Sequence, residues 1–150
     1  HQVIQLYEVL AELEGLSAKL ATRRMTKEER SKFEKLHKKI GNKIKDNNRD
    51  AFPALNKEFH DMIHRGAHNE ILEAEIDGLN KRLAPYRRIF HNEPHNLKVP
   101  YEEHRRVVAA VRNRNEEQAA QIFKDHTALR ADSITDFIAA FNQRFQKRSA

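Results

Sequence analysis

The stretch that decides the fold is HRRVVAAVRNRNEEQAAQIFKDH, residues 104–126. Apolar residues recur every three or four positions on both sides of the polar turn at residues 113–115, which predicts the body of one helix and the first turns of a second. A turn this short makes the two helices antiparallel neighbours. His104 and His126 fall on the two apolar stripes, so we expect both imidazoles to point into one interior.

A third histidine joins this pair from an earlier helix. In NKEFH, residues 56–60, Asn56 and His60 lie four positions apart and share one helix face. Neutral imidazole is a ligand for zinc, nickel and related divalent ions, and an amide adds a carbonyl oxygen. We therefore predict a metal site at Asn56, His60, His104 and His126, with zinc as the first choice and nickel as the second. Hydrogen-bonded core histidines without metal are the alternative interpretation.

The other histidines are weaker candidates for metal ligands. His60 and His64 also lie four positions apart and form a second-ranked ligand pair. Four more histidines are expected at the surface or in loops, namely His37, His68, His91 and His95.

Catalysis is not expected. Metal-assisted hydrolysis needs a carboxylate base near the ion, but Glu103 and Asp125 each directly precede a proposed ligand and should point elsewhere on their helices. The sequence has no Gly-rich phosphate loop, no Gly-x-Ser-x-Gly and no cysteine nucleophile. A metal-dependent enzyme is therefore the less favoured hypothesis.

Composition predicts one all-α domain spanning residues 1–150. The chain has no cysteine or tryptophan and only four glycines and four prolines, which is too few turn residues for a strand-rich fold. Residues 1–16 contain three glutamates and do not resemble a signal peptide, and no stretch approaches the roughly 20 apolar residues that span a bilayer. We expect a cytoplasmic protein that does not enter a membrane.

Helical periodicity and capping signals predict an antiparallel bundle of six helices. Thr26 and Glu29 form a capping box, Asp50 and Asn69 are expected caps, and Asn115 should cap the last helix. The expected spans are 2–24, 26–45, 50–66, 69–85, 100–112 and 115–147, with Pro53 and Pro100 in first turns, a kink or end at Pro85, and close packing at Gly15.

The last helix should extend beyond its partners. Its apolar face continues through Ile134, Phe137, Ile138, Phe141 and Phe145, so we expect part of it to pair with a second copy of the chain. The net charge of +6 comes from 28 Lys and Arg against 22 Asp and Glu. The basic residues at 27–45 are interleaved with glutamates, which favours a solvated face over a nucleic-acid site.

Several short segments occur in a telling order: LYEV at residues 6–9 followed by Leu13 and Glu14, LNKEFH at 55–60, NEIL at 69–72, Glu103 with His104, and Ala119 with His126. Together they resemble the ligand-binding domain of GntR-family transcription regulators, namely the FadR-type C-terminal domain called FCD. The likeness covers nearly the whole chain. Six helices rather than seven is similar to the VanR-like branch.

The resemblance implies an effector-sensing, usually homodimeric domain that holds zinc or nickel through one Asp and three His. A carboxylate metabolite then completes the coordination. His60, His104 and His126 match the three histidines, whereas Asn56 stands where the family has Asp. A neutral amide leaves more positive charge on the ion and weakens its binding.

The family's effector-binding arginine is also replaced here. Leu10 stands at its position, so Arg82 and Arg87, together with Tyr7, become the candidate effector ligands, with exposed arginines as the alternative interpretation. In such regulators a winged helix-turn-helix precedes this domain and reads DNA. The sequence contains no recognition helix of this kind and begins inside a helical pattern without Met. We expect a fragment that contacts DNA only through a missing N-terminal domain.

Overall fold

The computed structural model describes residues 2–91, 97–129 and 136, and the described part is helical without strands. The labelled helices are α1 (Gln2–Arg24), α2 (Lys27–Lys45), α3 (Phe52–Gly66), α4 (Glu70–His91) and α5 (Lys98–Arg112). A 3-10 turn, η1 (Arg49–Ala51), precedes α3, and residues 116–129 form a sixth helix, called here the 116–129 helix. The predicted all-α bundle of six helices is confirmed.

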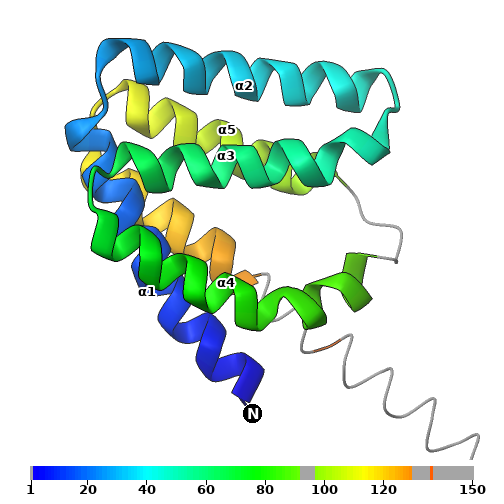
Figure 1. The fold of residues 1–150 in the computed structure, drawn as a ribbon. Coiled ribbons are helices and arrows are strands. Elements are labelled where there is room, and N and C mark those ends of the chain that lie inside the picture. Colours follow the sequence, from blue (N-terminus) through cyan, green and yellow to red (C-terminus); the bar gives the residue numbers. More distant parts are fainter. Residues whose placement is uncertain (1, 92–96, 130–135, 137–150) are drawn as a thin grey trace, which may run out of the picture.

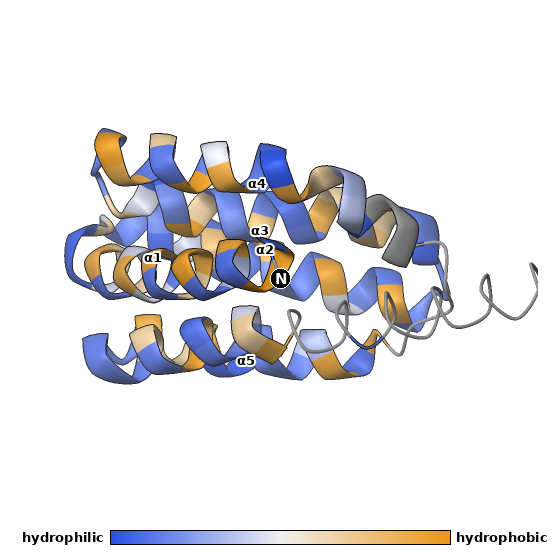
Figure 2. Ribbon diagram, turned by 90° about the horizontal axis from the view of Figure 1, so that it is seen from below, coloured by the Kyte–Doolittle hydropathy of each residue, from blue (hydrophilic) through white to orange (hydrophobic). Residues whose placement is uncertain are grey.

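Helix α1 occupies the middle of the bundle. It packs against α3, α4 and α5, and α2 packs against α3 and α5. Figure 1 shows α2 and α3 lying side by side, with the 116–129 helix returning from the end of α5 toward α1. Seen from below, α4 and α5 lie on opposite sides of α1, and apolar and polar residues alternate along each helix (Figure 2). None of the described helices is both long enough and apolar enough to cross a membrane.

Two apolar clusters fill the bundle. The first draws on α2, α3, α5, the 116–129 helix and the second half of α1, and includes Phe33, Ile40, Phe59, Val107 and Phe123. The second joins the first half of α1 to α4 and contains Leu6, Tyr7, Leu10, Ala67, Leu72, Ile76 and Leu83. On α1, Glu14 stands between Leu10 of the second cluster and Ala18 of the first. A carboxylate thus lies where the two clusters meet.

Most of the expected helix ends are observed. Thr26 accepts a hydrogen bond from the backbone N–H of Glu29, whose carboxylate accepts one from the backbone N–H of Thr26, so the capping box is confirmed. The side-chain oxygens of Asn69 and Asn115 each accept a hydrogen bond of 3.1 Å from the backbone N–H three residues later. Pro53 lies in the first turn of α3, where no internal donor is needed.

One expected helix cap is wrong. Asp50 does not cap α3, because η1 precedes that helix and Asn48 accepts the hydrogen bond from Ala51 N–H instead. At Pro85, where a kink or an end is expected, α4 does not end but continues to His91. The expected phenylalanine face of the last helix falls outside the described residues.

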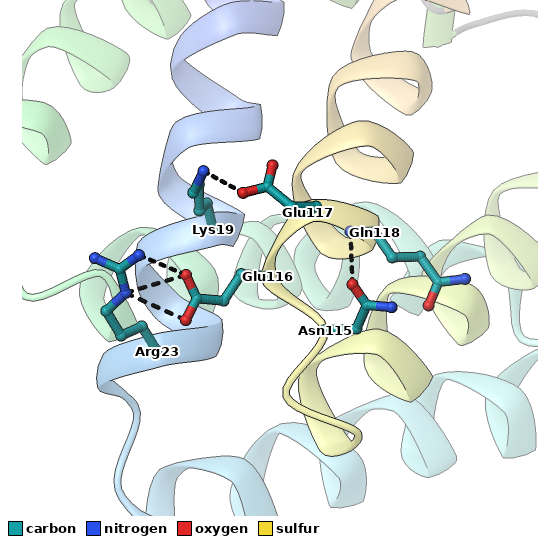
Figure 3. A network of polar contacts seen from close by, with 6 residues as sticks. All are labelled: Lys19, Arg23, Asn115, Glu116, Glu117 and Gln118. Atoms are coloured by element: carbon teal, nitrogen blue, oxygen red, sulfur yellow. Dashed lines mark hydrogen bonds and ion pairs between the residues drawn. The ribbon is translucent and has the colours of Figure 1, made fainter.

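The 116–129 helix lies close to α1 because of a glycine. A Cβ at Gly15 would lie 3.1 Å from the backbone oxygen of Ala120 and 3.2 Å from Cβ of Lys124, so the expected close packing is confirmed. Exposed ion pairs flank this contact: Lys19 with Glu117, and Arg23 with Glu116 at 2.7 Å (Figure 3). Because these pairs are exposed, they add little stability, and the close approach of the two helices at Gly15 carries the packing.

Two glycine substitutions should therefore act in opposite directions. Gly15→Val should lower the free energy of unfolding by about 1–3 kcal/mol, because its methyl groups meet the backbone of the neighbouring helix. Gly78→Ala should raise it by about 0.5–1 kcal/mol, because α4 gains helix propensity and a Cβ at Gly78 meets nothing within 4 Å. Urea unfolding followed by circular dichroism measures both, and a neutral Gly15→Val would contradict the close approach.

Candidate metal centre

Three imidazoles from three helices meet in the interior. His60 comes from α3, His104 from α5 and His126 from the 116–129 helix, and one ring nitrogen from each lies within 4.8 Å of the other two. His104 and His126 are buried, and the side chain of His60 is 12 % exposed. The short turn at residues 113–115 makes α5 and the 116–129 helix neighbours, which brings together two histidines 22 positions apart.

One pair of these nitrogens has the spacing expected of zinc ligands. Nε2 of His104 lies 3.3 Å from Nε2 of His126. Two nitrogens that each lie about 2.0–2.1 Å from a tetrahedral zinc ion are about 3.3–3.4 Å apart. The donor set is borderline-soft nitrogen, which zinc and nickel prefer. These residues therefore fit a divalent ion of this class.

Aromatic rings hold the imidazoles in place. The ring of Phe59 stacks on His104 with centroids 4.0 Å apart and planes 10° apart. The ring of Phe123 lies 4.8 Å from His60 and is nearly parallel to His126 at 5.9 Å. Both phenylalanines are fully buried, so the rings restrict imidazole rotation and lower the local dielectric constant.

Glu103 contacts this cluster, contrary to the expectation that it points elsewhere. Its carboxylate oxygen Oε2 lies 2.5 Å from Nδ1 of His126. Adjacent residues on a helix project in different directions, yet Glu103 and His104 both reach the ring of His126, one at each of its nitrogens. A carboxylate at Nδ1 keeps the proton on that nitrogen and leaves Nε2 as the lone-pair donor. Glu103 thus orients His126 without belonging to the three-histidine set.

A second carboxylate, that of Glu14 on α1, contacts His60 and its neighbour His64. It is only 3 % exposed. Its Oε2 lies 2.7 Å from Nε2 of His64, and its Oε1 lies 3.6 Å from Nδ1 of His60. Both partners come from α3, one helical turn apart.

Glu14 and His64 form a buried ion pair. Burial alone would raise the pKa of the Glu14 carboxyl, but the charge of His64 and the polar contacts with His60 and His64 outweigh burial and hold that pKa well below its ordinary value. Burial alone would lower the pKa of His64, but the charge of Glu14 and the same hydrogen bond raise it. Glu14, His60 and His64 also lie close enough to hold a cation, yet the 2.7 Å hydrogen bond from His64 already occupies Oε2 of Glu14.

The remaining predicted site residues are placed as follows. Asn56 is 8 % exposed and lies one turn before His60 on α3. Arg87 Nε donates a hydrogen bond of 3.0 Å to the Tyr7 hydroxyl, and its Nη1 donates one of 2.9 Å to Asn80 Oδ1. Arg82 is exposed. The structure thus brings Arg87 and Tyr7 together, whereas Arg82 lies on the surface.

Among the other histidines, one expectation is wrong. His37 is buried rather than at the surface, and its ring stacks on Tyr101 with centroids 4.4 Å apart. Burial lowers its pKa, so it is a neutral core residue. His68 is exposed as expected, and the side chains of His91 and His95 lie outside the described residues.

Sequence reasoning missed Glu14 and its pairing with His64. A usable signal existed for Glu14, because it continues the buried α1 stripe formed by Tyr7, Leu10 and Ala18. A carboxylate on an apolar stripe requires a buried partner. The identity of that partner, fifty positions away, depended on how α1 crosses α3.

The fold and this polar centre define a helical domain with nitrogen donors gathered inside it. The family model of the FCD domain matches residues 5–129, and the chain belongs to the FCD domain family. No curated protein sequence matches the chain.

Two solved structures are similar in fold. Streptococcus agalactiae GntR matches with a TM-score of 0.71 and 21% identity, over 87% of this chain and 58% of its own. Escherichia coli McbR/YncC matches with a TM-score of 0.71 and 19% identity, over 94% of this chain and 64% of its own. The chain therefore spans less than two thirds of the length of either protein.

A double-mutant cycle on Glu14 and His64 should measure the buried ion pair. Glu14→Leu or His64→Leu alone should each lower the free energy of unfolding by about 3–5 kcal/mol, since each leaves a buried charge without its partner. The double variant should cost clearly less than the sum, with a coupling of about 1–3 kcal/mol. The same cycle on the exposed pair Arg23 and Glu116 is the control and should give much weaker coupling. Additive effects at Glu14 and His64 would contradict the pairing.

Proposed function

We propose that this chain is the effector-sensing domain of a GntR-type transcription regulator and that it holds one divalent metal ion, zinc before nickel. The observation that carries the proposal is the meeting of His60, His104 and His126 from three helices within 4.8 Å. Membership of the FCD domain family and the likeness to two GntR-type regulators support the same class. The domain would act in the cytoplasm as a homodimer, with DNA contacted by an N-terminal winged helix-turn-helix.

In this proposal Asn56 is the fourth protein ligand. It shares a helix face with His60, and its amide oxygen is a weaker ligand than a carboxylate. Three imidazoles and an amide are all neutral, so the four protein ligands do not themselves offset the charge of the bound ion. An anionic effector at an open coordination position would then be attracted strongly, which favours a carboxylate metabolite.

Arg87 is the best-placed candidate for a second effector contact. It is half-buried and pre-oriented by Tyr7 and Asn80, so ordering its guanidinium on binding costs little entropy. Arg82 and Tyr7 remain candidates with it, although Arg82 is exposed. Arginine binds carboxylates in a bidentate geometry that suits an organic acid.

The sensing mechanism requires that the effector bind two dimer geometries with different affinities. The ion would link α3, α5 and the 116–129 helix, so ligand exchange at the ion changes how these helices are held together. A metal-dependent enzyme is the alternative function, and the nearest carboxylates argue against it. Glu103 and Glu14 are each engaged by a histidine, so neither is an unoccupied base.

Metal analysis tests the metal site directly. The chain purified without metal-affinity chromatography, loaded with zinc and dialysed should contain one zinc per chain by mass spectrometry. His104→Ala and His126→Ala should remove the ion and abolish the zinc-dependent rise in Tm, because a ligand that binds only the folded state stabilises it. His68→Ala, an exposed histidine, is the control. Absence of zinc from the wild type would leave a structural bundle with core histidines.

The effector site is tested by a thermal-shift screen of organic acids with and without zinc. A carboxylate effector should raise the Tm only in the zinc-loaded protein, and Arg87→Ala should weaken its binding by about 10-fold or more, since a charged hydrogen bond contributes about 1.5–3 kcal/mol. Arg82→Ala is the matched control, because that side chain lies on the same helix but is exposed. An equal loss in both variants would contradict the preference for Arg87.

A further inference from the structure

We propose that Glu14 and His64 form a positioning pair that sets the tautomer of His60, with the proton on Nδ1 and the lone pair on Nε2. The functional consequence rests on the proposed metal site, but the tautomer is a property of the metal-free chain. The two oxygens of Glu14 face two different histidines: Oε2 is 2.7 Å from His64 Nε2 and Oε1 is 3.6 Å from His60 Nδ1.

The position of Oε1 decides between the two tautomers of His60. A distance of 3.6 Å is longer than a hydrogen bond, but a carboxylate charge at that distance in a buried site strongly favours a proton on the nearer nitrogen. The remote nitrogen, Nε2, is then left as the donor available to a cation.

His64 is what keeps Glu14 in this place. A carboxylate that is only 3 % exposed would otherwise carry a large desolvation cost, and it would rotate toward solvent or take up a proton. The hydrogen bond from His64 occupies Oε2 and leaves Oε1 directed at His60. Because His64 follows His60 by one turn of α3, the two histidines present their rings to the same carboxylate.

The pair orients His60 rather than neutralising the ion. Glu14 and His64 together carry no net charge, so the pair does not offset the charge of a bound ion, whereas Oε1 acts locally on the near nitrogen of His60. Glu103 differs, because it contacts His126 directly at 2.5 Å without a cationic partner between them. The two carboxylates thus set the tautomers of His60 and His126, whereas His104 is held by the face of Phe59.

Nitrogen-15 NMR of the metal-free 150-residue chain tests the tautomer. Long-range proton–nitrogen correlations should show His60 in the Nδ1–H form. In Glu14→Gln, which preserves shape but removes the charge, the Nε2–H form of His60 should become populated. A His60 that is already Nε2–H in the wild type, or that does not change in Glu14→Gln, would overturn the proposal.

The zinc affinity gives a second readout. Loss of an outer carboxylate costs about 10–100-fold in metal affinity, so Glu14→Gln and His64→Ala should raise the zinc Kd by that factor while one ion per chain still binds. His64→Gln keeps a donor near Oε2 and should restore most of the affinity, which a merely structural role would not predict. Glu116→Gln, which removes an exposed carboxylate, is the control and should leave the Kd unchanged.

The outcomes separate the inference from the proposed function. Two zinc ions per chain, with one lost in Glu14→Gln, would mean that Glu14 and His64 are ligands of a second site, and the positioning role would fall. A wild-type chain that binds no zinc but shows the tautomer change would leave the positioning role intact and remove the metal site. If Glu14→Gln does not fold, the zinc Kd of His64→Ala compared with that of His64→Gln still tests the positioning role.

Discussion

Burial of polar groups inside a helical bundle is the constraint on which this structure depends. A helix satisfies its own backbone, but a buried imidazole or carboxylate must find its partner on another helix. Here Glu14 of α1 requires His64 of α3, and His126 requires Glu103 of α5. Each contact joins two different helices, so the relative placement of four helices is tied to one polar centre.

Burial of the apolar clusters offsets the free-energy cost of burying these polar groups. One cluster lies on each side of Glu14 along α1, and Phe59 and Phe123 pack directly on the imidazoles. These rings exclude water, which strengthens every charge interaction inside. Exclusion of water also makes a buried polar group without a partner strongly destabilising, so loss of one partner of an ion pair should destabilise the fold.

Much of the fold was predictable because it depends on local chemistry. The capping box at Thr26, the Asn69 and Asn115 caps and the close approach at Gly15 all follow from residue types at fixed spacing. The errors fell where a neighbouring segment overrides a local signal. Asp50 lost its capping role to Asn48 because a 3-10 turn intervenes, and His37 is buried because Tyr101 of α5 covers it.

The sequence by itself determined the helices and the stripes that carry His60, His104 and His126, since helical periodicity places a side chain on one face of its own helix. Only the tertiary structure decided which groups face each other across helices. No sequence spacing predicts the contact between Glu103 and His126, and Glu14 lies fifty positions from His64. The crossing of α1 over α3, and of the 116–129 helix beside α5, sets these contacts, because partners of buried charges are chosen by packing in three dimensions and not by distance along the chain.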